Sequence, residues 1–476
     1  MAKSKDKIRV RFIGGNSEDV TGSAILIEVS NYKILLEFGL FQSNNIYEDY
    51  EINNRRLDFK PSEIDYIFLN HAHADHSLLV PRLYANGCKA KIITPKGATS
   101  LFEIMATDSA FIMSKDVEVI SRKKKETVAP IYIKDDVLES LKFFEEYPMD
   151  ETIKLNDNIS FRFTPSGHII NAAQLELWLS RNNQTKKILY TSDLGNISVP
   201  KHYANTFKPI EFANLVIAES TYGSPDKKSV TMKTREKDLE KIKAIVQNVC
   251  INDGHKVLIP IFALDRSQNI LTCLYDIFGS YKDFNIPILI DSPLTIKLFN
   301  LYPSLLCGSE LEKFTEVMAW ENIKFINSYE ESIEWQNKKE PAIILAASGF
   351  MTAGRSKQWA KVLLPKSREH ILFVGYSSET SLAGRIKHGG EQKTVSIDGR
   401  PYANRCGITS LLSFTSHIQH DDMIDYYSGI RCEKIALVHG NFKGKIDFAK
   451  ELREVISSRN NTSKVLAVNR STEILL

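Results

Sequence analysis

The chain has 476 residues, 43% of them hydrophobic, and a formal net charge of +3 at pH 7. This length and apolar content suffice for two domains with separate cores, whereas the nearly neutral charge excludes a global basic field as the basis of nucleic-acid binding. Because the sequence contains no run of about 18 apolar residues, no apolar signal core at its start and no Cys-x-x-Cys pair among its six cysteines, we expect a cytoplasmic protein with free thiols and no membrane partner.

Short strands dominate roughly the first 220 residues, beginning with 8–13, 24–29 and 33–38, and a helix is predicted over 98–113. Beyond residue 231, helices and strands alternate. The predicted helices are 231–249, 266–278 and 294–302, and the predicted strands are 256–261, 286–291, 323–326, 342–346 and 370–374. This alternation favours a parallel sheet covered by helices. Short strands return at 408–414 and 435–438.

The change of character indicates one domain interrupted by another. We place the first part of the outer domain at 1–222, the inserted domain at 223–400 and the C-terminal return at 401–476. We expect the insert to cap a site on the outer domain and to leave a cleft that favours unpaired strands over duplex.

Residues 71–76 read His-Ala-His-Ala-Asp-His and follow the apolar run 64–70, which has the composition of a buried strand. Side chains alternate in extended chain, so His71 and His73 point to the same side. The turn that follows can direct Asp75 and His76 to a second, adjacent point. Nitrogen and carboxylate ligands divided between two points suit a dinuclear Zn²⁺ site, and such a cluster would be costly to bury without a metal.

Three further predicted strands end just before a side chain that can bind a metal: His168, Asp193 and His439. Glycines beside them (Gly167, Gly195 and Gly440) would let the backbone turn sharply. Taken singly, each of the three could equally be structural, but their common placement after strands favours ligands. Asp193 is the natural bridging carboxylate, because a bridge offsets part of the repulsion between two dications.

The order His-x-His-x-Asp-His, Ser-Gly-His, Ser-Asp-Leu-Gly resembles the metallo-β-lactamase superfamily. The continuation is similar to its β-CASP branch of nucleic-acid hydrolases: Glu219, His417 and His439 match the three additional motifs of that branch. Segments 19–23, 257–268, 291–293, 348–355 and 375–376 also resemble the cleavage-and-polyadenylation endonuclease and its compact prokaryotic relatives. The likeness spans nearly the whole chain and implies an α/β protein, a metallo-β-lactamase αββα sandwich with an inserted parallel-sheet β-CASP domain.

The resemblance implies a zinc-dependent endoribonuclease that hydrolyses single-stranded RNA to 5′-phosphate and 3′-hydroxyl ends. Histidine at the third motif is typical of members that act on RNA. The implied ligands of two Zn²⁺ ions are His71, His73, Asp75, His76, His168, Asp193 and His439. The implied catalytic residues are Asp75, Glu219 and His417, with His417 as general acid for the departing 3′-oxygen and Glu219 orienting it.

Candidate substrate-binding residues lie in the insert. The glycine-containing loop 348–354 precedes a predicted helix, and such a loop can offer backbone N–H groups to a phosphate. As a bare pattern it would favour a structural turn, but the resemblance favours phosphate contact. The candidates are Ser348, Gly349, Arg355, Arg266 and Arg385. Basic stretches at 122–125 and 227–228, with Lys233 and Arg235, are weaker candidates, because short basic runs usually form a solvated surface.

Four positions depart from the family pattern without removing a ligand: Glu37 and Gln419 where aspartate is usual, Asn70 for threonine and Leu78 for glycine. Three alternatives stay open: a 5′→3′ exoribonuclease, a nuclease acting on DNA, against which His439 argues, and a weakly active scaffold that binds RNA or protein, which Glu37 allows. The short segment after His439 favours the compact endonucleolytic group, and the homodimer common among prokaryotic relatives is left open.

Overall fold

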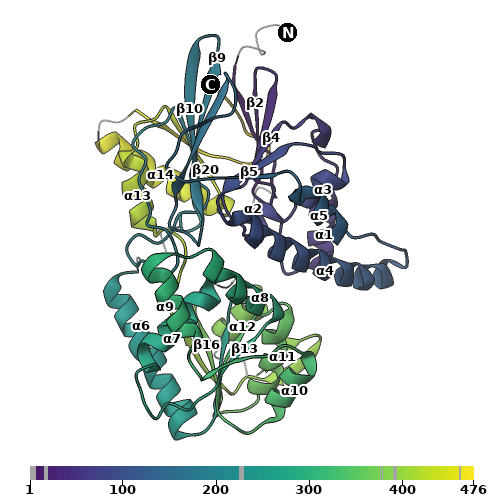
Figure 1. Ribbon diagram of the computed structural model, residues 1–476, viewed down its shortest axis with the longest axis vertical. Helices are drawn as coiled ribbons and strands as arrows, with labels where there is room; N and C mark the ends of the chain where they lie inside the picture. The colour runs from purple at the N-terminus through teal and green to yellow at the C-terminus, as the bar shows by residue number, and fades with distance from the viewer. Residues whose placement is uncertain are drawn as a thin grey trace. The chain divides into compact units, whose positions relative to one another are not determined.

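A computed structural model describes residues 7–15, 20–224, 230–375, 377, 379–389, 394–459 and 462–476. The chain divides into two compact units, both drawn in Figure 1. Unit 1 comprises Met1–Pro200, Ala204–Ser229 and His417–Leu476, and unit 2 comprises Lys201–Tyr203 and Val230–Ser416. Four residues singled out in the sequence, Asp19, Lys227, Lys228 and Tyr376, lie outside the described residues.

Unit 1 contains two seven-stranded sheets. The first has the order β22 (Glu473–Leu475), β1 (Arg9–Phe12), β2 (Ile25–Val29), β3 (Tyr32–Leu36), β4 (Tyr66–Phe68), β5 (Lys91–Pro95), β6 (Phe144–Tyr147). The second has the order β21 (Lys464–Ala467), β20 (Lys434–Val438), β11 (Leu215–Glu219), β10 (Gln184–Tyr190), β9 (Ala173–Arg181), β8 (Ile159–Pro165), β7 (Ile153–Lys154).

Alternation along the strands gives each sheet two apolar faces. In β2, Ile25 and Ile27 enter the core between the sheets, whereas Leu26 enters the core beneath the helices α3 (Val80–Ala85), α4 (Ala98–Lys124) and α5 (Lys134–Leu141). The outer face of the second sheet packs against α13 (His420–Gly429) and α14 (Phe442–Ser458). Unit 1 is therefore the expected αββα sandwich, with α4 longer than the predicted helix 98–113.

Unit 2 is built on a six-stranded sheet whose strand pairs are all parallel. Its order is β14 (Ile323–Phe325), β13 (Ile288–Asp291), β15 (Ala342–Ala346), β12 (Lys256–Pro260), β16 (His370–Phe373), β19 (Gly407–Ser410). The intervening helices include α6 (Met232–Ile245), α7 (Arg266–Phe278) and α11 (Gly354–Leu363). The parallel sheet predicted from the alternating pattern is confirmed.

One strand lies in a different unit from the one we expected. The sequence pattern predicts that the strand 408–414 belongs to the C-terminal return beginning at residue 401, but β19 pairs in parallel with β16 and extends the sheet of unit 2. The chain returns to unit 1 only at His417. A short apolar strand carries no signal that tells which sheet it joins, because that choice depends on backbone pairing far along the chain.

Strand direction explains why polar residues from distant segments meet in unit 1. Strands β10, β11 and β20 are parallel neighbours, so their carboxyl ends lie at one edge of the second sheet. β8 runs in the same direction, because β9 pairs antiparallel with both β8 and β10. In the first sheet, the loop after β4 carries residues 71–76. Among the described residues, no helix is long and apolar enough to cross a membrane.

Candidate metal centre

The motif at 71–76 is held in place by its own short helix and by the backbone of residues 37–40. His73 lies at the N-cap of α2 (Ala74–Ser77), so His71 and His73 are in extended chain while Asp75 and His76 are helical. The Phe38 N–H donates to the His76 carbonyl at 2.9 Å. Gly39 packs so closely that a Cβ there would lie 1.7 Å from the Asp75 carbonyl oxygen. The loop is thus fixed by backbone contacts before any ligand binds.

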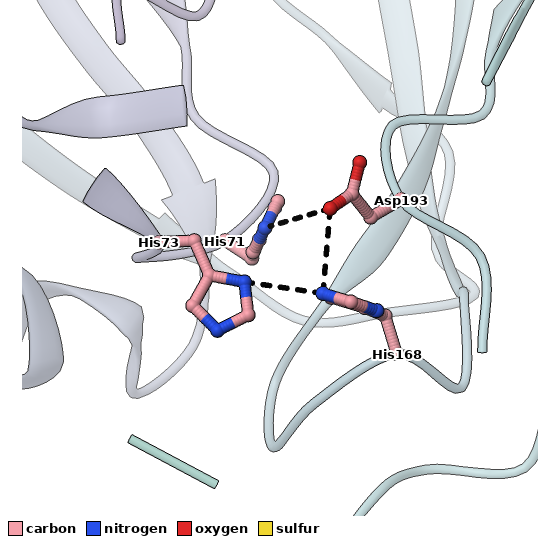
Figure 2. Close-up of side chains that lie close together, drawn as sticks. All are labelled: His71, His73, His168 and Asp193. Carbon is pink, nitrogen blue, oxygen red and sulfur yellow. Dashed lines mark hydrogen bonds and ion pairs between the residues drawn. The ribbon is translucent and has the colours of Figure 1, made fainter. Parts of the chain in front are cut away.

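One group of ligand-type side chains consists of His71, His73, His168 and Asp193, whose donor atoms all lie within 4.8 Å of one another (Figure 2). His168 Nε2 is 3.1 Å from His73 Nδ1 and 3.4 Å from Asp193 Oδ2. His71 Nε2 is 3.8 Å from the same carboxylate oxygen. Three imidazoles and a carboxylate oxygen converging on one point are a donor set suited to Zn²⁺.

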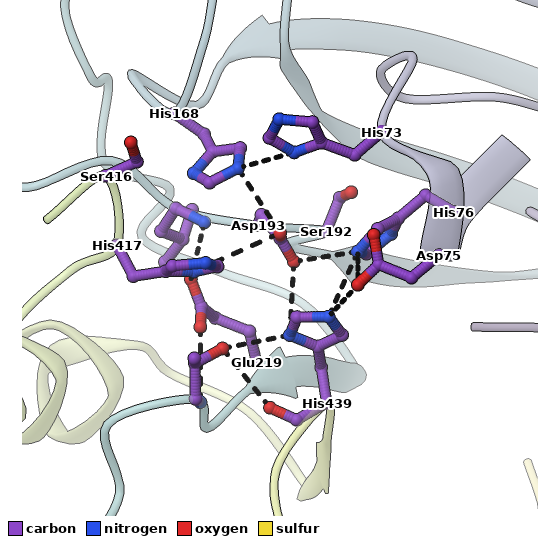
Figure 3. A network of polar contacts seen from close by, with 12 residues as sticks. His73, Asp75, His76, His168, Ser192, Asp193, Glu219, Ser416, His417 and His439 are labelled. Atoms are coloured by element: carbon purple, nitrogen blue, oxygen red, sulfur yellow. Dashed lines mark hydrogen bonds and ion pairs between the residues drawn. The ribbon is translucent and has the colours of Figure 1, made fainter. Parts of the chain in front are cut away.

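A second group consists of Asp75, His76 and His439 (Figure 3). His439 Nε2 lies 3.1 Å from His76 Nε2 and 3.2 Å from Asp75 Oδ2. His439 comes from the end of β20 and Asp75 from α2, which are 364 residues apart in the sequence. These side chains form a second point of convergence next to the first.

Asp193 faces both groups with different oxygens. Its Oδ2 is turned toward His71 and His168, while its Oδ1 lies 3.2 Å from His76 Nε2 and 3.4 Å from His439 Nδ1. The structure therefore brings all seven predicted ligands together around one shared carboxylate.

The protonation states of His71, His168 and Asp193, and two buried atoms without hydrogen bonds in the described part of the chain, fit a bound cation. His71 Nε2 and Asp193 Oδ1 are buried and have no hydrogen-bond partner among the described residues. Burial lowers the pKa of His71 and of His168 well below the usual range, which keeps both imidazoles neutral. Burial opposes ionisation of Asp193, but the surrounding histidines hold its pKa well below its usual range. Neutral imidazoles and an ionised carboxylate are the forms that coordinate metals.

Glu37, which stands where the family usually has aspartate, is fully buried and hydrogen-bonded at both oxygens. His76 Nδ1 lies 2.5 Å from Oε2, the Tyr190 hydroxyl donates to the same oxygen at 2.5 Å, and the Ser192 hydroxyl donates to Oε1 at 2.8 Å. By holding Nδ1 of His76, the carboxylate directs Nε2 toward Asp75 and Asp193. The longer side chain is accommodated at this position.

His417 lies beside the first group, with its Nδ1 3.4 Å from Glu219 Oε1 and 4.0 Å from Asp193 Oδ2. Glu219 is the last residue of β11, and its Oε1 also accepts the Leu194 N–H at 2.7 Å. The His417 side chain is 20% exposed, whereas that of Glu219 is 1% exposed. A buried carboxylate thus orients an imidazole that reaches solvent at the edge of the centre.

Three supporting side chains were not anticipated from the sequence. Tyr190 and Ser192 fix Glu37, and the Thr221 hydroxyl lies 2.9 Å from His439 Nδ1. Ser192 directly precedes Asp193, and Thr221 follows Glu219 by two residues, so their places in the motifs could have marked them. Tyr190 is the last residue of a buried strand and carries no comparable signal.

The predicted substrate-binding residues lie in unit 2. The guanidinium groups of the three arginines among them are hydrogen-bonded to other residues of that unit. Arg355 Nη1 donates to Asp291 Oδ1 at 3.0 Å, Arg266 Nη1 donates to the Val374 carbonyl at 2.7 Å, and Arg385 Nη2 donates to the Ser396 carbonyl at 3.3 Å. Ser348 and Gly349 precede α11, and a Cβ on Gly349 would lie 2.7 Å from the Phe262 ring. Their role in RNA binding stays a prediction.

Three family models match successive parts of the chain: the metallo-beta-lactamase superfamily at residues 18–141, the Beta-Casp domain at 267–386 and the Zn-dependent metallo-hydrolase RNA specificity domain at 402–462. Ribonuclease TTHA0252 of Thermus thermophilus is 27% identical, over 90% of this chain and 92% of that protein. Transcription termination factor FttA of Methanocaldococcus jannaschii is 24% identical, over 95% of this chain and 70% of that protein. Endoribonuclease YSH1 of Candida glabrata is 24% identical, over 91% of this chain and 55% of that protein.

The αββα sandwich, with histidines and aspartates gathered at the ends of its strands, defines a hydrolase of the metallo-β-lactamase superfamily. Within that superfamily, the chain belongs to the β-CASP family of RNA-processing nucleases, as the second and third matched domains and the relatives show.

Proposed function

We propose that this chain is a zinc-dependent endoribonuclease that hydrolyses phosphodiesters of single-stranded RNA and leaves 5′-phosphate and 3′-hydroxyl ends. The observation that carries the proposal is the position of Asp193, whose two oxygens face two separate groups of histidines. Such a carboxylate fits two ions close together, and a pair of metals suits in-line displacement at phosphorus.

His71, His73 and His168 would hold one zinc ion, Asp75, His76 and His439 the other, and Asp193 would bridge them. Bound zinc lowers the pKa of a coordinated water to roughly 7 and stabilises negative charge on the phosphate oxygens. Glu37 keeps His76 oriented, and Thr221 does the same for His439. These contacts fix the donor atoms before substrate arrives.

The remaining chemical requirement is a proton for the departing 3′-oxygen. His417 is suited to supply it, because it is partly exposed beside the metal centre and its Nδ1 is turned toward the buried Glu219 carboxylate. With Nδ1 directed to Glu219, Nε2 would be the atom that gives its proton to the leaving group, a contribution of typically ~10²–10⁴-fold. RNA as the substrate is supported by the RNA specificity domain and by the ribonucleases among the relatives.

The test uses an internally labelled single-stranded RNA with a 5′-triphosphate, incubated with zinc-loaded protein. Discrete internal fragments, lost in Asp75→Ala, would establish endonucleolytic cleavage. Release of mononucleotides only from 5′-monophosphate RNA would assign an exonuclease instead, and no cleavage by protein that holds two zinc ions would favour the binding scaffold.

The role of His417 has its own test. His417→Ala should slow cleavage by about 10²–10⁴-fold without loss of zinc. A substrate whose scissile 3′-oxygen is replaced by sulfur has a leaving group that needs no protonation, so on that substrate the variant should approach the parent rate. Equal slowing on both substrates would show that His417 is not the acid.

A further inference from the structure

A hollow in unit 1 opens beside His439. It has a volume of about 70 Å³ and lies between residues 20–25, the end of β20 and the first turns of α14. Its polar lining includes Ser23, His439, Lys445, Asn469 and Arg470. A buried water needs roughly 10–15 Å³ on this measure, so the hollow can take a group of the size of a phosphate.

Lys445, on α14, is the unusual member of this lining. The residue is 5% exposed, and its Nζ donates to the Val468 carbonyl at 2.8 Å and lies 5.6 Å from the centre of the Phe442 ring. Among the residues that the structure describes, no carboxylate forms an ion pair with it. Burial lowers the pKa of Lys445 to about 8.

A buried ammonium group without a counter-charge is unfavourable for folding, and an apolar side chain of the same length would fill the site without that cost. The described lining of the hollow contains no aspartate or glutamate that could accept the charge. Arg470 adds a second positive group, and its Nη2 donates a hydrogen bond to Asp58 Oδ2 at 2.8 Å. The hollow is therefore suited to an anion.

We propose that this hollow binds a phosphate of the RNA strand next to the phosphodiester at the metal centre, with Lys445 as its principal ligand. The proposal rests on the proposed function, since His439, a candidate metal ligand, forms one wall of the hollow. It adds a contact that none of the predicted substrate-binding residues makes, because those residues lie in unit 2.

The direction of the strand follows from a second hollow of about 30 Å³. The two hollows share Gly14, Gly22, Ala24 and Arg470 in their linings, so they adjoin one another. The second hollow also carries Arg55 and the exposed Arg56. A strand bound at Lys445 would continue past Arg470 toward these guanidinium groups.

The test measures binding of single-stranded RNA to zinc-loaded His417→Ala protein, which keeps the candidate ligands and should cleave the probe about 10²–10⁴-fold more slowly than the parent. Adding Lys445→Met should weaken binding by about tenfold or more and reduce the slope of log affinity against log salt by about 0.7, as loss of one phosphate contact requires. Lys450→Met, an exposed lysine on the same helix, is the matched control and should leave affinity within about twofold of the parent.

The phosphate is located with RNAs that carry one neutral methylphosphonate, moved along the strand. A methylphosphonate at one position beside the cleaved bond should weaken RNA binding to the protein that retains Lys445. The same substitution should not further weaken RNA binding to the Lys445→Met protein. Unchanged affinity and salt slope in Lys445→Met, or a methylphosphonate effect that persists there, would overturn the proposal. If inorganic phosphate protects Lys445 from chemical modification but no methylphosphonate position in the RNA affects binding, the proposal is also overturned and the hollow is assigned to a free anion.

Stability separates a binding role from a structural one. Lys445→Met removes an unpaired buried charge, so its melting temperature should equal or exceed that of the parent, whereas a structural lysine would lower it. Lys445→Gln provides a second neutral variant if the methionine variant fails to fold. The two proposals fail separately: RNA cleavage with no Lys445 effect refutes only the phosphate site, and Lys445-dependent binding without cleavage refutes only the nuclease.

Discussion

Glu37 stands where the family pattern usually has aspartate, and its surroundings show how the longer side chain is tolerated. The backbone there is left-handed, with φ of 57°, and the carboxylate is held by Tyr190 and Ser192 as well as by His76. The extra methylene therefore ends in a fixed set of hydrogen bonds and does not leave a mobile side chain. The imidazole it orients keeps its donor atom within the centre.

Replacing Glu37 with glutamine tests this role. The amide has the same shape but lacks the charge that holds Nδ1 of His76, so zinc affinity should fall by about 10–100-fold. Competition with a chromogenic chelator measures the change. The Tyr190→Phe variant keeps the Glu37 carboxylate, so its zinc affinity should fall less than that of Glu37→Gln. Equal zinc affinity in Glu37→Gln and the parent would contradict an orienting role.

Gln419, the other departure, has a simpler explanation. It is the N-cap residue of α13, it is 4% exposed, and its side-chain amide donates to the His417 carbonyl at 3.0 Å. An amide can donate this bond, whereas an ionised aspartate cannot. The residue thus supports the backbone that carries His417.

At the level of elements, glycine contacts fix the separation of the loops that carry the ligands. Besides Gly39 against Asp75, a Cβ on Gly195 would lie 1.9 Å from the Gly167 carbonyl oxygen. These two contacts hold the segments of Asp75 and His76, and of His168 and Asp193, at backbone distance. Any side chain at either position must displace a segment that carries ligands.

Gly39→Ala should therefore lower the free energy of unfolding by about 1–3 kcal/mol and also reduce zinc affinity. Chemical denaturation and zinc titration measure the two effects. Gly429→Ala is the matched control, because a Cβ there meets nothing within 4 Å at the end of α13. Its stability should be unchanged or slightly raised. A Gly39→Ala protein as stable as the parent would show that the loop can shift freely.

The sequence predicted much of this arrangement, for identifiable reasons. His71, His168, Asp193 and His439 each follow a strand, and a strand is recognisable from its own apolar run. The αββα order and the parallel sheet came from element order and from motif resemblance. Two features could not be predicted: which sheet β19 joins, and the hydrogen bond from Tyr190 to Glu37. Both depend on contacts between segments far apart in the chain.

For the whole molecule, a metal ion held by the buried cluster of imidazoles and carboxylates would be coupled to the stability of unit 1. Zinc that binds only the folded state stabilises it by about 2.7 kcal/mol when present at 100 times its Kd. Calorimetry of zinc-loaded and chelator-treated protein should therefore show a lower melting temperature after metal removal. An unchanged transition would contradict a centre that holds metal in the folded chain.

The same measurement has a defined pH dependence. Burial opposes the charged form of His76, but Asp193, Glu37 and Asp75 raise its pKa well above the usual value, so a cation competes with a proton at this imidazole. Zinc stabilisation should accordingly shrink as pH falls and grow as pH rises. A melting-temperature difference independent of pH would contradict this competition.

The separation of Asp75 and His439 by 364 residues has a consequence for synthesis. The last donor atom of the centre leaves the ribosome long after the first, and β1 can pair with β22 only when Glu473–Leu475 have also emerged. A growing chain therefore carries an incomplete centre until His439 has emerged. If the chain is the ribonuclease we propose, the messenger being read is spared from it up to that point.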